Sequence, residues 1–147
     1  AFPEVRLKRF LEMRGADGGP WGRLCALPAL WAGLLYHQPS LDAAWDIASD
    51  WSMEERLKLR EDVPRLGLKA TVRGRSVQSI AQEVVELARI GLSARARLNS
   101  AGDNETGFLT PLQEVADRGI TPAERKLALF QGEWNGSVDP VFRECAY

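Results

Sequence analysis

Residues 4–14 alternate between apolar and charged side chains, and this run constrains the fold of the 147-residue chain more than any other feature. In an extended chain, one face would carry Val5, Leu7, Leu11 and Met13, broken only by Arg9, and the other face would carry Phe10 among charged side chains. This period of two predicts a single β-strand that packs one face on a core. A glycine loop at residues 15–22 then ends the strand, because glycine and proline interrupt regular structure.

Helical patterns fill residues 23–147, where apolar side chains recur at spacings of three and four. Capping boxes are predicted at Ser52, Thr110 and Thr121, each followed three residues later by Glu or Gln. The longest helix is expected over residues 76–98. The predicted fold class is therefore a predominantly α-helical chain of about six helices with one N-terminal β-strand.

Two prolines and one serine set further expected helix boundaries. Pro28 interrupts an apolar stripe over residues 27–35, so it should lie in the first turn of that helix. Ser40 is predicted to cap the next helix. The helix that opens at Ser52 should end before Pro64.

A lone strand cannot satisfy its own backbone hydrogen bonds. We therefore expect residues 1–147 to form one unit of a longer protein, in which a missing N-terminal region supplies the partner strands. Because an unpaired strand edge recruits other strands, self-association of the chain through this edge is also expected.

The charge balance excludes several classes of partner. The net charge is −1, from 19 basic and 20 acidic residues, so we expect neither nucleic-acid nor membrane binding. The arginines between residues 73 and 97 are mixed with Glu83 and Glu86, which is typical of a solvated helix face. Cys25 and Cys145 lack metal-site spacing and are interpreted as reduced thiols, Cys25 buried, in a cytoplasmic protein.

Glu12 and Arg14 are the first candidates for a functional site. On a strand their Cα atoms would be about 6.5 Å apart, with both side chains on one face. A carboxylate so placed can hold a divalent cation while the guanidinium reaches an oxygen of the same phosphate chain. The alternative is a surface ion pair, which contributes only about 0–1 kcal/mol.

Two residues near this pair, Asp17 and Arg23, each have two interpretations, and two tryptophans are interpreted as structural. Asp17 is either a neighbour of that site or an aspartate that stabilises the loop. Arg23 is either a phosphate contact or a salt-bridge residue. Trp21 is interpreted as a core anchor and Trp45 as a packing residue on a helix stripe.

Four segments carry a resemblance to a known family: "FLEMRGADGGPWGRLCALPALWAGLLYH", "GLKATVRGR", "ITPAERKL" and "GEWNGSVDPVF". In this order they resemble the glutamate–cysteine ligases of the plant and proteobacterial class. The resemblance spans Phe10 to Tyr147 and implies that the chain is the C-terminal third of an α+β, glutamine synthetase-like enzyme.

The resemblance also implies a chemistry. Such a ligase uses ATP and Mg²⁺ to join glutamate to cysteine through a γ-glutamyl phosphate, the first step of glutathione biosynthesis. Glu12 would be a Mg²⁺ ligand, and Arg14 a catalytic contact to the terminal phosphate of ATP. Asp17 and Arg23 would be further candidates for nucleotide contacts, and Trp134 would be structural. The chain alone is expected to be inactive.

Two other functions stay open at this point. The chain is either a helical interaction or regulatory module that docks through its strand, or part of a related carboxylate–amine ligase with another amine acceptor.

Overall fold

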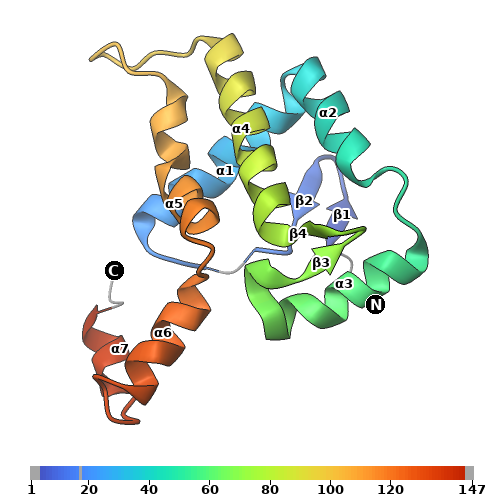
Figure 1. Ribbon diagram of the computed structural model, residues 1–147. Helices are drawn as coiled ribbons and strands as arrows, with labels where there is room; N and C mark the ends of the chain where they lie inside the picture. The colour runs from blue at the N-terminus through green and yellow to red at the C-terminus, as the bar shows by residue number, and fades with distance from the viewer. Residues whose placement is uncertain (1–3, 17, 145–147) are drawn as a thin grey trace.

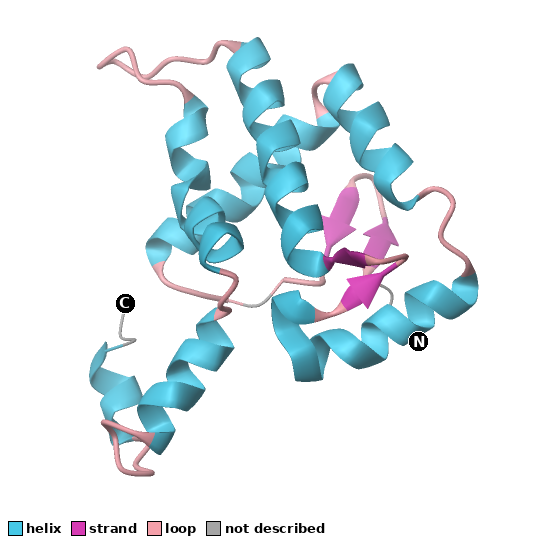
Figure 2. Ribbon diagram, in the orientation of Figure 1, coloured by secondary structure: helices cyan, strands magenta, loops and turns pink. Residues whose placement is uncertain are grey.

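The computed structural model describes residues 4–16 and 18–144 of the chain, and these are mostly helical (Figures 1 and 2). The helices are α1 (Trp21–Leu35), α2 (Gln38–Ala48), α3 (Met53–Leu66), α4 (Val77–Arg95), α5 (Thr110–Arg118), α6 (Pro122–Gln131) and α7 (Asp139–Glu144). Two 3₁₀ helices, η1 (Gly67–Lys69) and η2 (Glu105–Leu109), lie between them. The predicted helical fold class is confirmed, with seven α-helices in the described residues instead of about six.

The N-terminal run forms a hairpin, so the prediction of one continuous strand over residues 4–14 is wrong. Strand β1 (Val5–Leu7) pairs antiparallel with β2 (Leu11–Met13), and residues 8–10 make the turn. Alternation with a period of two is the same in one long strand and in two short ones. No glycine or proline at residues 8–10 signals the reversal. Each strand still lacks a second partner strand in the part of the chain that the structure describes.

The core lies where α1 crosses α4. Ala29 and Leu34 of α1 pack with Val85, Ala88 and Leu92 of α4. In Figure 1, α1 passes behind α4, with α5 and α2 on either side. These helices form the body of the described chain, and the N-terminal hairpin and the C-terminal helices lie around it.

A second hairpin, which the sequence analysis did not predict, connects α3 and η1 to α4. Strands β3 (Thr71–Val72) and β4 (Arg75–Ser76) pair across a turn at Arg73 and Gly74. Both turn residues have positive φ, 50° and 76°. Arginine rarely adopts this conformation, so residue preference alone does not indicate the turn.

Two of the three predicted capping boxes are confirmed. Ser52 and Thr121 each accept a hydrogen bond from the backbone N–H of the glutamate three residues on, which bonds back to the cap residue. The predicted capping box at Thr110 is wrong. Thr110 is already the first residue of α5, and its hydroxyl donates to the Gly107 carbonyl at 3.0 Å.

Three other predicted boundaries also differ. Helix α1 begins at Trp21, so the glycine loop is shorter than predicted and Pro28 lies inside the helix instead of in its first turn. Helix α3 continues through Pro64 to Leu66. Ser40 does not cap α2; it is buried in the first turn of that helix and donates to the Leu87 carbonyl of α4 at 2.8 Å. Tertiary contacts override the local signal at Ser40.

The last two helices project from the body as an arm, which Figure 1 shows in orange and red. Gly119 ends α5 with a φ of 65°, and Thr121 then caps α6. Among the described residues, no helix has both the length and the apolar character that crossing a membrane requires.

Candidate active site

Strand β2 positions Glu12 opposite Arg6 of β1, in the centre of the N-terminal hairpin. The Arg6 Nε lies 3.6 Å from Glu12 Oε2, and Lys8 Nζ lies 3.3 Å from Glu12 Oε1. The Glu12 side chain is therefore held between two cations on one face of the hairpin. Its side chain is 33% exposed, so these ion pairs are only partly screened by water.

The Oε2 oxygen of Glu12 has an ion-pair partner, Arg6, but its hydrogen-bonding capacity is not used within the described residues. Oε2 is buried and has no hydrogen-bond partner in the described residues, which is a costly state for a carboxylate oxygen. A hard cation such as Mg²⁺ prefers carboxylate oxygens as ligands. The described residues contain no group of three metal-ligating side chains. Glu12 thus fits the role of one ligand in a site whose other ligands would come from elsewhere.

Arg14 follows β2 directly and extends the pairing of the hairpin. Its backbone N–H donates to the Glu4 carbonyl at 2.8 Å, so the chain is still extended at this residue. Two residues after Glu12 in an extended segment, Arg14 leaves from the same face. Its side chain is exposed and makes no ion pair within residues 4–16 and 18–144. The ion-pair partners of Glu12 are thus Arg6 and Lys8, and not Arg14.

Of the other two candidate site residues, the structure describes only Arg23, which lies apart from this pair. Asp17 lies outside the described residues, as does Cys145. Arg23, on α1, lines two hollows formed with α6, and neither Glu12 nor Arg14 lines them. Figure 1 shows the linker between β2 and α1 running from the hairpin toward α6.

Four of the aromatic and thiol predictions can be compared with burial. Trp21 is 76% exposed and Trp45 is 66% exposed, so the assignment of both to packing is wrong within this chain. Both lie on amphipathic helices, whose pattern alone does not say which of several faces is covered. Trp134 is buried, and its indole N–H donates to Glu144 Oε1 at 3.2 Å. Cys25 is half-buried, not buried.

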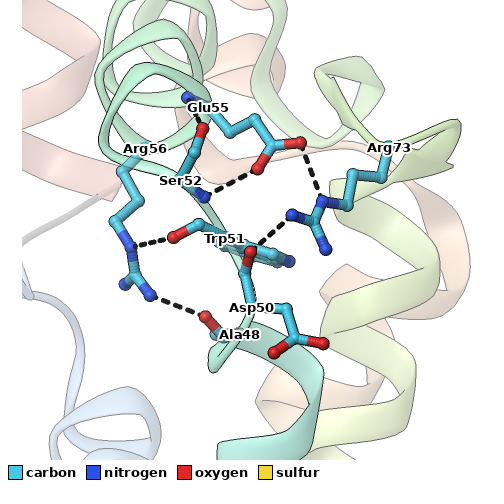
Figure 3. Close-up of polar contacts among 7 residues, drawn as sticks. All are labelled: Ala48, Asp50, Trp51, Ser52, Glu55, Arg56 and Arg73. Carbon is cyan, nitrogen blue, oxygen red and sulfur yellow. Dashed lines mark hydrogen bonds and ion pairs between the residues drawn. The ribbon is translucent and has the colours of Figure 1, made fainter.

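A polar network that the sequence analysis missed joins three segments (Figure 3). Arg73 of the β3–β4 turn donates from Nε to Glu55 Oε1 at 2.7 Å, and its Nη2 donates to the Asp50 carbonyl. Arg73 had been interpreted as part of a solvated helix face, which is wrong because it lies in a turn. The hydrogen bond from Arg73 and that from the Ser52 backbone lower the pKa of Glu55 to about 2.

Arg56 completes this network from the other side of the α2–α3 connection. Its Nε donates to the Trp51 carbonyl at 3.0 Å and its Nη2 to the Ala48 carbonyl at 2.6 Å (Figure 3). The two arginines thus donate to three carbonyl groups at and just after the end of α2, those of Ala48, Asp50 and Trp51, where helical partners run out. This network is structural: it fixes α2, α3 and the second hairpin relative to one another.

Comparison with known proteins decides the family. The model of glutamate–cysteine ligase family 2 matches residues 1–144. This chain belongs to that family. The chloroplastic glutamate–cysteine ligase of Nicotiana tabacum is 56% identical over 146 residues, which are 99% of this chain and 27% of that protein. The corresponding chloroplastic proteins of Arabidopsis thaliana and Oryza sativa subsp. japonica (ligase B) are 53% identical over the same share of this chain, covering 27% and 28% of their own lengths.

These family members correct two expectations. The chain spans about a quarter of the length of these relatives, and not a third. The predicted cytoplasmic location is overturned, since all three relatives are named as chloroplastic proteins. Reduced thiols do not distinguish the cytoplasm from other reducing compartments.

Proposed function

We propose that the protein to which this chain belongs is an ATP-dependent glutamate–cysteine ligase, which makes γ-glutamylcysteine for glutathione biosynthesis. The observation that carries this proposal is the similarity to glutamate–cysteine ligases, at 53–56% identity over almost the whole chain. The relatives' names also support a plastid location. The alternative interaction module gains no support from membership of an enzyme family.

The proposed reaction has two steps. The γ-carboxylate of glutamate attacks the terminal phosphorus of ATP, giving γ-glutamyl phosphate and ADP. The cysteine amine then attacks the acyl carbon, phosphate leaves with the electron pair of the broken C–O bond, and the amine loses a proton. Both steps move negative charge onto phosphate oxygens, which cationic groups stabilise.

Arg14 is the residue of this chain that we propose as a catalytic phosphate contact. Its guanidinium is exposed and unpaired within the described residues, and a planar guanidinium matches two phosphate oxygens. Glu12 would hold Mg²⁺ through Oε2, the oxygen without a hydrogen bond. When bound, the metal would neutralise charge on the phosphates.

Arg6 and Lys8 have a supporting role in this proposal. Both lie within 3.6 Å of the Glu12 carboxylate and orient it. Asp17 and Arg23 remain proposals as further nucleotide contacts. Because Arg23 lines hollows that exclude Arg14, any contact that it makes would be to a different group of the ligand.

Phosphate release by the full-length protein tests the function. We expect release that requires ATP, glutamate and cysteine together. Replacing cysteine by other amines at equal concentration separates a glutamate–cysteine ligase from a ligase with another acceptor. Release without glutamate, or without any amine acceptor, would contradict the proposal.

A further inference from the structure

The arm helix α6 and the start of α1 enclose a hollow of about 260 Å³. Its walls carry three cationic side chains: Arg23 from α1, and Arg125 and Lys126 from α6. Gly18 and Gly19 of the glycine loop form another wall. We call this the basic hollow. Figure 1 shows the loop before α1 passing near the beginning of α6.

The basic hollow has more positive than negative charge. Glu144 is the one carboxylate among the described residues that line it, and this carboxylate accepts the hydrogen bond from the Trp134 indole. Neither Arg23, Arg125 nor Lys126 forms an ion pair within the described ranges, although ten ion pairs occur elsewhere in them. Three cations that face one space repel one another, so an anion there would be stabilised.

The glycine loop directs Arg23 along this space. A Cβ built on Gly19 would lie 3.4 Å from Arg23 Cβ, 3.5 Å from Cδ and 4.0 Å from Nη1. The Arg23 side chain therefore passes beside Gly19, with its Cβ, Cδ and Nη1 all close to this glycine. This packing orients one of the three cations before any ligand arrives, which lowers the entropy lost on binding.

We propose that the basic hollow binds a phosphate group through Arg23, Arg125 and Lys126. The proposal deepens the one made for Arg23, and it rests on the proposed function for the choice of phosphate as the ligand. Phosphate carries up to two charges on three free oxygens, which suits a hollow lined by three cations better than a monocarboxylate does. Two arginines can each bind two of these oxygens, and the lysine adds a point charge.

Chemical footprinting of the full-length protein tests this site without relying on activity. Acetylation of Lys126 is followed by mass spectrometry with increasing orthophosphate, tripolyphosphate or ATP, and with citrate as a carboxylate control. A ligand at tenfold excess over its Kd should slow acetylation about tenfold. The comparison of orthophosphate with tripolyphosphate and ATP identifies whether free phosphate or a nucleotide tail is the ligand.

Matched variants separate the site from general charge. Arg125→Gln should raise the phosphate concentration needed for protection about tenfold, because a charge-assisted hydrogen bond is lost. Arg125→Lys should recover part of the lost phosphate affinity, because the charge is kept and the planar fork is lost. Arg97→Gln removes the same charge from an exposed residue outside the basic hollow and should leave protection unchanged.

Three outcomes would overturn the site. They are equal protection in Arg125→Gln and Arg97→Gln, equal protection by citrate and tripolyphosphate, and a Lys126 that is unreactive without any anion. The proposed ligase function fails differently, through absence of substrate-dependent phosphate release in the unmodified protein. An active enzyme with no protection of Lys126 would therefore exclude the phosphate site alone.

Discussion

Gly91 of α4 lies directly on the backbone of Gly33 in α1. A Cβ built on Gly91 would be 1.8 Å from the Gly33 carbonyl oxygen, and one built on Gly33 would be 2.2 Å from the Ala88 carbonyl oxygen. Both glycines are buried. The two helices that form the core therefore touch backbone to backbone, and any side chain at either residue must separate them.

Gly91→Ala should destabilise the chain by about 1–3 kcal/mol, the usual range for an overpacked core. Intrinsic helix preference acts in the opposite direction, because alanine favours a helix by about 1 kcal/mol over glycine. Urea unfolding followed by circular dichroism measures the change. The matched control is Gly107→Ala, where the added Cβ would meet nothing within 4 Å. A Gly91→Ala protein as stable as the control would mean that the helices do not cross here.

The hydrogen bond between Arg73 and Glu55 predicts a pH dependence of stability. The pKa of Glu55 is lowered from 4.5 to about 2 in the folded chain, so its contribution is fully present above pH 4.5. It should be lost as the pH falls from about 4.5 to about 2. In urea unfolding across this range, Glu55→Gln should lose less stability than the unmodified chain. Glu54→Gln, one residue earlier in the first turn of α3, is the control and should behave like the unmodified chain.

Arg14 and Glu12 should have separable kinetic effects in the full-length enzyme. Arg14→Ala should lower kcat by roughly 10²–10³, or about 3–4 kcal/mol, because the contact is strongest when charge develops. Arg14→Lys should recover part of this loss. Glu12→Gln should instead raise the Mg²⁺ concentration needed for half-maximal rate. Near-normal turnover of a folded Arg14→Ala enzyme would mean that this arginine is only a surface charge.

The 147 residues alone should show neither ligase activity nor tight binding of Mg·ATP. Glu12 is the only metal ligand proposed in this chain, and the described residues contain no cluster of three metal-ligating side chains, whereas Mg²⁺ requires near-octahedral oxygen coordination. Calorimetric titration of the chain with Mg·ATP and the phosphate-release assay both check this. Turnover near that of the full-length enzyme would place the whole catalytic site within this quarter of the protein.

The N-terminal hairpin should make the isolated chain associate with itself. Its outer strand edges are unpaired in the described residues, and Leu7 and Leu11 are 80% and 52% exposed. Such an edge pairs readily with another copy. Sedimentation velocity should show dimers that increase with concentration, and Leu7→Lys should reduce them. The variant Leu127→Lys, which changes an exposed leucine of α6, should leave the dimer unaffected.

Local signals predicted the fold where local interactions decide it. The boxes at Ser52 and Thr121 are confirmed because their hydrogen bonds span only three residues. Ser40 was misplaced because its hydroxyl bonds to Leu87, 47 residues away. The N-terminal hairpin was missed because its turn uses neither glycine nor proline, and the second hairpin because contacts from Glu55 and Asp50 hold Arg73 in a conformation that arginine rarely adopts.

The candidate site was predictable only in part for a similar reason. The spacing of Glu12 and Arg14 predicts a shared face in any extended segment, whether strand or hairpin. It does not predict that the partners of Glu12 are Arg6 and Lys8, because those ion pairs arise from the turn. The three cations of the basic hollow come from helices about a hundred residues apart, so no local pattern brings them together.

The arm of α6 and α7 extends from the body in Figure 1, and the basic hollow is one place where the two meet. An anion held there would contact Arg23 on the body and Arg125 on the arm, and so would link the two parts across residues 119–121, which separate α5 from α6. Such a link would make local opening of α6 less frequent when the anion is bound. Occupancy would then be seen as slower amide hydrogen exchange in α6.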